Sequence, residues 1–282
     1  MTSSSHYIDR DIEDFLIATV RDAAAKAIMP RFRNLSGTDV AEKTGETDLV
    51  TLADTEAERL MTEAIRRELP EAIVVGEEAV SADPSLLGRI EGAPFCVILD
   101  PVDGTWNFAH GLGLFGVILA VCRYGEPVYG LLYDPVTDDM IGGNMGRGAF
   151  RGIERLKREK LRASSKTELG TLSGYVPMNI FPREVQPDLV AAVPEFLRIL
   201  NLRCAVHEYR MVAQGHMDFC LSGTLNSWDH AAGSLIVREA GGVSKTLTGE
   251  PYSAAVNTGY LLTAGTSAAW NALAERFAFL VR

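Results

Sequence analysis

The stretch of sequence that decides the expected fold and chemistry is residues 95–107, which read Phe-Cys-Val-Ile-Leu-Asp-Pro-Val-Asp-Gly-Thr-Trp-Asn. Its first five residues are apolar and rich in strand-favouring types, which indicates a buried β-strand. This strand runs into two carboxylates, Asp100 and Asp103. Gly104 and Thr105 follow and can open a helix, whose first backbone N–H groups bind phosphate oxygens well. The stretch therefore predicts an anion-binding turn with two acids beside it.

Two carboxylates beside such a turn repel each other and also repel a phosphate. A divalent cation resolves this conflict, and carboxylate oxygens are the hard ligands that Mg²⁺ prefers. A local explanation is also open, because Asp-Pro and Asp-Gly are common turn sequences in which the side chain caps its own backbone. The stretch alone favours neither explanation.

Further acidic residues lie at the expected ends of helices and strands. Glu77 and Glu78 follow a short apolar strand, and one of the pair is expected to be solvated. Asp54 follows Thr51 by three residues, as in a capping box with Asp in place of Glu. Asp229 stands at the start of a small-residue helix, where an N-cap is a simple explanation. Local structure explains each acid separately, but their repeated placement at element ends favours one shared site.

Hydrophobic periodicity predicts helices and strands along the whole chain. Helices are expected at residues 6–32, 53–69 (ended by Pro70), 185–200, 229–240 (closed by Gly241 and Gly242) and 264–277, and a further helix is expected to end within 210–215. Strands are expected at residues 72–75, 95–99, 116–122, 128–133, 140–150 and 219–221, and a loop or tight hairpin at 43–47 precedes residues 48–51. This mixture predicts a layered α/β or α+β architecture.

Length and composition are those of a globular protein. The 282 residues allow one or two domains of ~150 residues each, and the 47% of hydrophobic residues suffices for a core. The longest apolar run, residues 112–122 with its glycines, is far shorter than the ~20 residues of a membrane helix, and the first residues show no signal-peptide pattern. We therefore expect no membrane partner and a cytoplasmic location. The four cysteines form no CxxC pair, which fits reduced thiols.

The formal net charge is −10, from 27 Lys and Arg against 37 Asp and Glu. An acidic surface repels the phosphate backbone, so no nucleic-acid partner is expected. It repels a small phosphate ester as well, unless bound cations reverse the sign of the charge at the site. The pattern GxGxxG at residues 111–116 leads into an expected strand rather than a helix, which argues against a dinucleotide site.

Several of these segments together resemble the inositol monophosphatase family of Mg²⁺-dependent phosphatases. The resemblance rests on segments that occur in the family's order: Lys43 with Asp48-Leu-Val-Thr51-Leu-Ala-Asp54, Gly76-Glu77-Glu78, Asp100-Pro-Val-Asp103-Gly-Thr105-Trp-Asn107-Phe108, and Trp228-Asp229-His-Ala-Ala-Gly233. It covers nearly the whole chain. The resemblance implies a layered α-β-α-β-α sandwich that forms a single unit over residues 1–282, with lobes at about 1–160 and 161–282, and a homodimer.

The resemblance also implies which residues hold two or three Mg²⁺ ions. Glu77, Asp100 and the carbonyl of Val102 would hold the first ion. Asp100 would bridge to a second ion, which Asp103 and Asp229 would complete. Divalent cations placed in this way activate water at neutral pH and clamp the oxygens of an in-line displacement.

Catalytic roles for Asp54, Thr105 and Glu77 follow from the same resemblance. Asp54 would lie beside the site and hold a weaker third Mg²⁺ or its waters. The Thr105 hydroxyl, together with Glu77, would orient the attacking water, and the backbone amides of Gly104 and Thr105 would hold the phosphate. The residues expected to contact the substrate are Asp103, Gly104, Thr105 and Asp229.

The implied function is Mg²⁺-dependent hydrolysis of a small phosphate monoester, with inositol 1-phosphate as the leading substrate. One alternative is the same chemistry on histidinol phosphate, a sugar phosphate or a 3′-phosphonucleotide. Another is a protein-binding regulator with secondary activity. Retention of the expected acids argues against the regulator, because carboxylates crowded without a metal destabilise a fold.

One departure from the family pattern concerns the substrate. Relatives selective for inositol usually carry a glutamate several residues before the Trp-Asp motif, and Ser222 stands in that place here. A serine makes a weaker contact with a polyol, so relaxed or shifted specificity is expected. Upstream, Glu208 and Arg210 are expected either to face the substrate or to lie on a solvated helix face.

Overall fold

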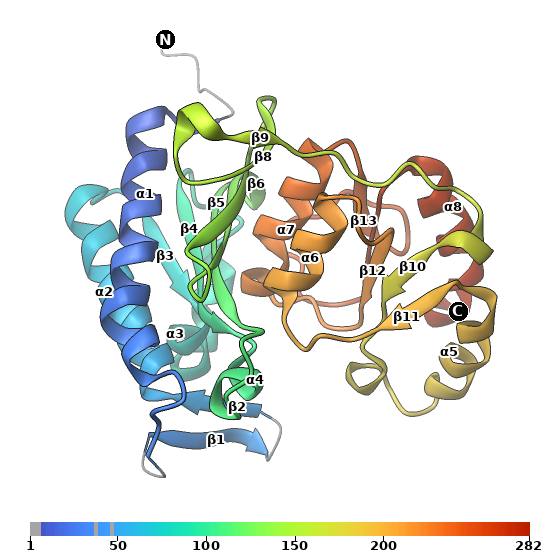
Figure 1. The fold of residues 1–282 in the computed structure, drawn as a ribbon, viewed down its shortest axis with the longest axis horizontal. Helices are drawn as coiled ribbons and strands as arrows, with labels where there is room; N and C mark the ends of the chain where they lie inside the picture. The colour runs from blue at the N-terminus through green and yellow to red at the C-terminus, as the bar shows by residue number, and fades with distance from the viewer. Residues whose placement is uncertain (1–6, 37–38, 46–47) are drawn as a thin grey trace.

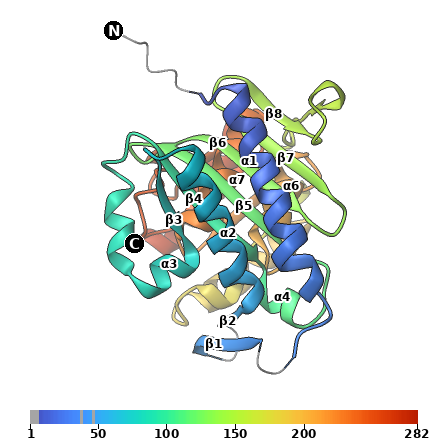
Figure 2. The same cartoon turned by 90° about the vertical axis from the view of Figure 1, so that its left-hand side faces the viewer.

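Two long helices form the outermost layer on one side of the molecule (Figure 1). α1 (Arg10–Ala23) begins at Asp9, whose Oδ1 accepts a hydrogen bond from the Ile12 N–H at 3.0 Å. α2 (Leu52–Glu68) begins at a capping box and confirms the helix expected at 53–69. The apolar faces of both helices pack on one face of a large sheet, which lies behind them in Figure 2.

The computed structural model describes residues 7–36, 39–45 and 48–282, and the helix expected at 6–32 is only partly correct within them. His6 lies outside the described residues. After α1 the chain continues as a π turn (Ala24–Ile28) and a 3₁₀ turn (Met29–Arg31). Pro30 favours this change, because it lacks the N–H that a regular helix would use.

The hairpin expected before residues 48–51 is confirmed by two short strands. β1 (Val40–Gly45) pairs antiparallel with β2 (Asp48–Thr51). Of the expected loop, Glu46 and Thr47 lie outside the described residues. The hairpin lies next to the short helix α4 (Thr105–Ala109) at one edge of the molecule (Figure 1).

The large sheet has seven strands in the order β3-β4-β5-β6-β7-β8-β9. Its strands are β3 (Ile73–Gly76), β4 (Cys96–Asp103), β5 (Gly116–Arg123), β6 (Glu126–Asp134), β7 (Asp139–Asn144), β8 (Gly148–Arg151) and β9 (Glu159–Lys160). β3 and β4 are parallel, and the other neighbouring pairs are antiparallel. The single strand expected at 140–150 is wrong. It is a hairpin of β7 and β8, because Gly146 in its turn adopts φ +70°, which favours glycine.

Two helices, α6 (Ala205–Ala213) and α7 (Ser227–Glu239), fill the layer between the two sheets (Figure 1). They confirm the helix expected to end within 210–215 and the helix expected at 229–240. α7 contacts strands of both sheets and is buried on most of its surface. Its close approach to β6 requires Gly130, because a Cβ there would meet the backbone oxygen of Ala232 at 2.7 Å.

The smaller sheet has five strands in the order β11-β10-β12-β14-β13. Its strands are β10 (Ser173–Tyr175), β11 (Arg198–Leu200), β12 (Phe219–Ser222), β13 (Val243–Thr246) and β14 (Leu261–Ala264). β12 confirms the strand expected at 219–221, whereas the other four strands were not predicted. α5 (Gln186–Ala192) and α8 (Ser267–Arg276) cover the outer face of this sheet (Figure 1).

Both outer helices of this half are shorter than expected. The helix expected at 185–200 ends at Ala192, a 3₁₀ turn containing Pro194 follows, and residues 198–200 form the edge strand β11. The helix expected at 264–277 begins at Ser267, because Ala264 ends β14 and the Thr266 side chain caps the helix.

The succession of helices, sheet, helices, sheet and helices confirms the expected α-β-α-β-α sandwich (Figure 1). Apolar clusters lie between successive layers. None of the helices formed by the described residues has the length and apolar character that a membrane crossing requires.

Candidate active site

β4 presents Asp100 and Asp103 to one point although the two residues are three positions apart. In a regular strand, residues three apart point to opposite faces of the sheet. β4 pairs with β5 at Asp100–Ile118 and next at Asp103–Gly116, so β4 holds one extra residue between these pairs. Such a bulge re-aims side chains and is common beside active sites. The two carboxylates therefore converge.

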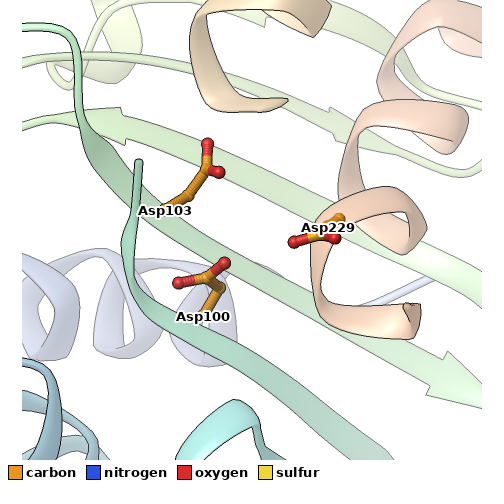
Figure 3. A group of neighbouring side chains, drawn as sticks. All are labelled: Asp100, Asp103 and Asp229. Carbon is orange, nitrogen blue, oxygen red and sulfur yellow. The ribbon is translucent and has the colours of Figure 1, made fainter. Parts of the chain in front are cut away.

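Asp229 reaches the same point from the central helix layer. It lies in the first turn of α7, and one carboxylate oxygen from each of Asp100, Asp103 and Asp229 lies within 4.8 Å of the others. Figure 3 shows the three side chains as one group of neighbours, Asp100 and Asp103 from β4 and Asp229 from the start of α7. Asn226 orients Asp229, because its Nδ2 donates to Asp229 Oδ2 at 3.1 Å. Two distant parts of the sequence thus form one acidic group.

Burial and mutual repulsion oppose the charged forms of these carboxylates. Burial raises the pKa of Asp100 and of Asp229 well above the ordinary value, and the nearby charges of Glu77 and Asp103 raise both further. Burial also raises the pKa of Asp103. Crowded anionic oxygens of this kind are a donor set suited to a hard divalent cation such as Mg²⁺. The residues present therefore fit the metal that the sequence predicts.

The carboxylate of Asp103 is anchored to the start of α6. The Val206 N–H donates to Asp103 Oδ2 at 2.5 Å, and the buried Cys204 thiol donates to the same oxygen at 3.1 Å. These hydrogen bonds stabilise the charged form and so oppose the effect of burial on the pKa of Asp103. They also fix the chain before α6 relative to β4.

Glu77 and Glu78 begin the short helix α3 (Glu77–Ala82), and both pair with one lysine. Lys43 Nζ, from β1, lies 2.8 Å from Glu77 Oε1 and 2.6 Å from Glu78 Oε1. The expectation that one of the two glutamates is solvated is therefore wrong, because the hairpin brings a cation over both. Glu77 lines the same cavity as Asp100, but it is not among the three acids that converge within the described chain.

Asp54 makes both a capping contact and a contact with the candidate site. Its Oδ2 accepts a hydrogen bond from the Thr51 N–H at 2.8 Å, which confirms the capping box at the start of α2. Its Oδ1 accepts a hydrogen bond from the Thr105 hydroxyl at 3.2 Å. Burial raises the pKa of Asp54 to about 7, and the hydrogen bonds from Thr51 oppose this rise.

The turn after β4 has the expected form. Gly104 adopts φ +87°, and a Cβ there would meet the Leu114 oxygen at 2.8 Å, so glycine is required. Thr105 then begins α4, and its hydroxyl donates to the Val102 oxygen at 2.9 Å. A hydroxyl has one hydrogen and two lone pairs, so Thr105 Oγ1 can still accept a hydrogen bond from the cavity that it lines.

A cavity of about 280 Å³ lies at this point of the structure, and Asp54 does not line it but contacts the lining residue Thr105. The predicted residues in its wall are Glu77, Asp100, Val102, Asp103, Gly104, Thr105 and Asp229. Five more lining residues were given no role by the sequence: Leu49, Trp106, Arg203, Asn226 and Trp228. Leu49, Trp106 and Trp228 lie inside the segments that carry the family resemblance. Arg203 has no such signal, because a single arginine in a loop belongs to no motif.

Three residues that the sequence connected with the substrate, Ser222, Glu208 and Arg210, do not line the cavity. Ser222 ends β12, its hydroxyl donates to the backbone of the next turn at 2.9 Å, and it does not line the cavity. Glu208 accepts a hydrogen bond from the Leu202 N–H at 2.8 Å, and burial raises its pKa to about 8. Arg210 is buried and pairs with Asp139 at 2.5 Å. Glu208 and Arg210 thus hold internal contacts instead of facing substrate or solvent.

Comparison with known proteins identifies the family to which this layered fold belongs. The family model described as the inositol monophosphatase family matches residues 9–281. The chain belongs to the inositol monophosphatase family.

Relatives with several names share this similarity. The chain is 28% identical over 244 residues to an inositol-1-monophosphatase of Bacillus subtilis, covering 86% of the chain and 88% of the relative. It is 32% identical over 221 residues to a fructose-1,6-bisphosphatase/inositol-1-monophosphatase of Thermotoga maritima, covering 77% and 78%. It is 33% identical over 235 residues to the Nus factor SuhB of Haemophilus influenzae, covering 78% and 81%.

A solved structure supports the same assignment of fold. The Thermotoga maritima IMPase superposes on the chain with a TM-score of 0.80 and 26% sequence identity. The superposition covers 96% of this chain and 98% of that structure.

Proposed function

We propose that this protein is a Mg²⁺-dependent phosphomonoesterase for a small phosphate ester, with inositol 1-phosphate as the leading substrate. The observation that carries the proposal is the convergence of Asp100, Asp103 and Asp229 in one cavity that is also lined by Gly104 and Thr105. An acidic group alone has no affinity for a phosphate, whereas the same group with bound cations attracts one.

The proposed metal ligands are those that the resemblance implies. Glu77, Asp100 and the Val102 carbonyl would hold one Mg²⁺, and Asp100, Asp103 and Asp229 a second. When bound, Mg²⁺ supplies positive charge for the phosphoryl oxygens and lowers the pKa of water. Support comes from the oxygen-rich wall of the cavity and from the raised pKa values of the three aspartates.

Asp54 and Thr105 have proposed roles in positioning water. The single hydrogen of the Thr105 hydroxyl is shared between Asp54 Oδ1 and the Val102 oxygen, so its lone pairs are left to accept a hydrogen bond from a donor in the cavity. With Glu77, it would orient the attacking water. Asp54 would hold a weaker third Mg²⁺ or its waters. The amides of Gly104 and Thr105 would hold the phosphate.

We propose relaxed rather than strict specificity for inositol 1-phosphate. The Ser222 hydroxyl donates its hydrogen within its own turn, so it can offer a ring hydroxyl only a neutral acceptor, which is a weaker contact than the carboxylate of a glutamate. Histidinol phosphate, a sugar phosphate and a 3′-phosphonucleotide stay as alternative substrates. The Thermotoga maritima relative is named for two different substrates, fructose 1,6-bisphosphate and inositol 1-phosphate, which is consistent with this breadth.

The test is release of inorganic phosphate in Mg²⁺ from a panel of esters. We expect inositol 1-phosphate to be hydrolysed, with a kcat/KM within about a thousandfold of the other esters, which is about 4 kcal/mol of discrimination. A larger preference for inositol 1-phosphate contradicts relaxed specificity. Absence of hydrolysis across the panel contradicts the phosphatase proposal and favours the alternative of a protein-binding regulator.

The homodimer implied by the resemblance is also part of the proposal. A molar mass in solution of about twice the 30.6 kDa of one chain supports it. A mass equal to that of one chain contradicts it.

A further inference from the structure

Arg203 stands at the edge of the acidic cavity and is held over an aromatic ring. Its guanidinium carbon lies 4.3 Å from the centroid of the Trp106 ring, and both side chains line the cavity. The Trp106 ring also stacks on His110, with ring centroids 4.0 Å apart. Stacking on an aromatic face restricts a guanidinium to one plane and leaves its N–H groups directed along that plane.

The backbone around Arg203 is fixed in a conformation that favours glycine. Arg203 adopts φ +54°, which is unfavourable for a residue with a Cβ. Hydrogen bonds impose it: Asn107 Nδ2 donates to the Leu202 oxygen at 2.9 Å, and the Arg203 N–H donates to Asn201 Oδ1 at 2.8 Å. This conformation fixes the direction in which the Arg203 side chain leaves the backbone.

The position of Arg203 is also fixed relative to the proposed metal ligands. The next residue, Cys204, and Val206 both donate to Asp103 Oδ2. Among the described residues that line the cavity, Arg203 is the cationic one, and the other charged residues of the wall are Glu77 and three aspartates. A guanidinium matches carboxylate and phosphate groups through paired N–H donors.

We propose that Arg203 binds a second anionic group of the substrate, so that the preferred esters carry a carboxylate or a second phosphate besides the phosphate that is hydrolysed. This inference rests on the proposed function, in which the hydrolysed phosphate lies at Asp100, Asp103 and Asp229. The second anion would lie at the edge of the cavity that Arg203 and Trp106 form. Relaxed specificity does not by itself say which phosphate esters are preferred, and esters with a second anionic group are the class proposed here.

The experiment uses pairs of esters that differ only in the second anionic group. 3-Phosphoglycerate is compared with glycerol 3-phosphate for a carboxylate, and fructose 1,6-bisphosphate with fructose 1-phosphate for a second phosphate. We expect the wild-type protein to prefer the doubly anionic member of at least one pair in kcat/KM. The preferred pair identifies which anion Arg203 takes. Arg203→Gly, which suits the backbone, should lower that preference by about ten- to a hundredfold.

Two further variants separate a contact with the substrate from a general effect. Arg203→Lys keeps the charge but not the planar pair of donors, and it should restore only part of the preference. Arg33→Gly is the matched control: Arg33 adopts φ +58°, lies over the Phe32 ring and does not line the cavity. It should leave the preference unchanged. An equal loss for both members of each pair in Arg203→Gly overturns the inference, because Arg203 would then act on the hydrolysed phosphate.

A binding measurement keeps this inference separate from the proposed function. In Thr105→Ala, where turnover is expected to be slow, calorimetry in Mg²⁺ gives Kd for 3-phosphoglycerate and glycerol 3-phosphate with and without Arg203→Gly. A preference for 3-phosphoglycerate that Arg203→Gly removes supports the inference even if no ester is hydrolysed. Equal affinities in both backgrounds, together with no preference for the bisphosphate in kcat/KM, overturn it while leaving any phosphatase activity intact.

Discussion

Thr105 Oγ1 lies 3.2 Å from Asp54 Oδ1, so the residue that completes the capping box of α2 also contacts the candidate site. The two carboxylate oxygens of Asp54 divide these tasks, since Oδ2 takes the hydrogen bond from the Thr51 N–H. A substitution at this position therefore tests a structural and a functional contact at once, and the two have different readouts.

Asp54→Asn is expected to reduce activity more than stability. We expect phosphate release to fall at low Mg²⁺ and to recover partly at high Mg²⁺, because a ligand to a weakly held ion or its waters is impaired. The capping contribution is ~1 kcal/mol, which thermal melting can detect. Asp9→Asn is the control, because Asp9 caps α1 through the Ile12 N–H and does not line the cavity. A large melting shift in Asp54→Asn with unchanged kinetics would assign Asp54 to capping alone.

Asp103→Asn is expected to lower kcat by orders of magnitude, because it removes one charged oxygen from the converging acids. Asp134→Asn is a matched control. Asp103 and Asp134 are both 8% exposed, and both accept hydrogen bonds from backbone N–H groups. Asp134 does not line the cavity, so its variant should keep nearly full activity. Hydrolysis at the wild-type rate by Asp103→Asn is incompatible with the proposed pair of ions.

A chelator is expected to abolish phosphate release while the protein stays folded. Three clusters of buried apolar residues lie between the layers, and we expect their burial to hold the fold together without a metal. Far-UV circular dichroism in EDTA should match that in Mg²⁺, and added Mg²⁺ should restore activity. Persistent hydrolysis in EDTA contradicts the metal requirement. Loss of the helical signal would show that a metal holds the fold together.

Without a metal, the protein is expected to lose stability as the pH rises from 6.5 to 8. Burial raises the folded-state pKa of Asp54 to about 7 and of Glu208 to about 8, and raises those of Asp100 and Asp229 as well. The folded state therefore holds protons that the unfolded chain, with carboxyl pKa values of about 4, has already released. The stability from these groups is fully present below the unfolded pKa and is lost as the pH rises through the folded pKa.

The titration of His230 sets the lower limit of the pH range in which this loss of stability can be measured. Burial lowers the pKa of His230 from 6.5 to about 4, so it makes the protein more stable as the pH rises toward 6.5 and has no further effect above it. Thermal melting in EDTA from pH 6.5 to 8 should show a falling midpoint, and Asp54→Asn should make the fall smaller. A midpoint that rises over this interval would show that these carboxylates are charged in the folded state.

The sequence predicted best those helices and strands that are long and whose buried residues recur at a regular spacing. α2 shows the spacing of three and four that a helix needs, and β5 is an uninterrupted apolar run. β11 was missed because it has three residues and two of them are exposed, so its residues continue the helical pattern before it. Its identity as a strand depends on parallel pairing with β10, which local sequence does not contain.

The sequence predicted which acidic residues form the group, but it did not predict how their carboxylates come together in space. The family resemblance joins Asp100, Asp103 and Asp229, yet their convergence depends on the bulge in β4 and on how α7 packs against the large sheet. Both are properties of register and packing. Arg203 was missed for the same reason, because a hydrogen bond from the distant Asn107 holds the backbone beside it. Asn226 was missed although its contact with Asp229 is local, because a single asparagine before a helix belongs to no motif.

Asp103 and Asp229 lie far apart in the sequence, and this separation has a consequence for the nascent polypeptide during translation. Asp103 ends β4, but the groups that orient its carboxylate belong to α6, and its partner Asp229 belongs to α7. A nascent polypeptide that has emerged from the ribosome only as far as β9 contains the large sheet and α1 and α2, yet it lacks a complete set of acids. Ester hydrolysis should therefore begin late in translation, once the central helices have docked. In a cell-free synthesis, released phosphate would then report completion of the tertiary structure rather than formation of its first half.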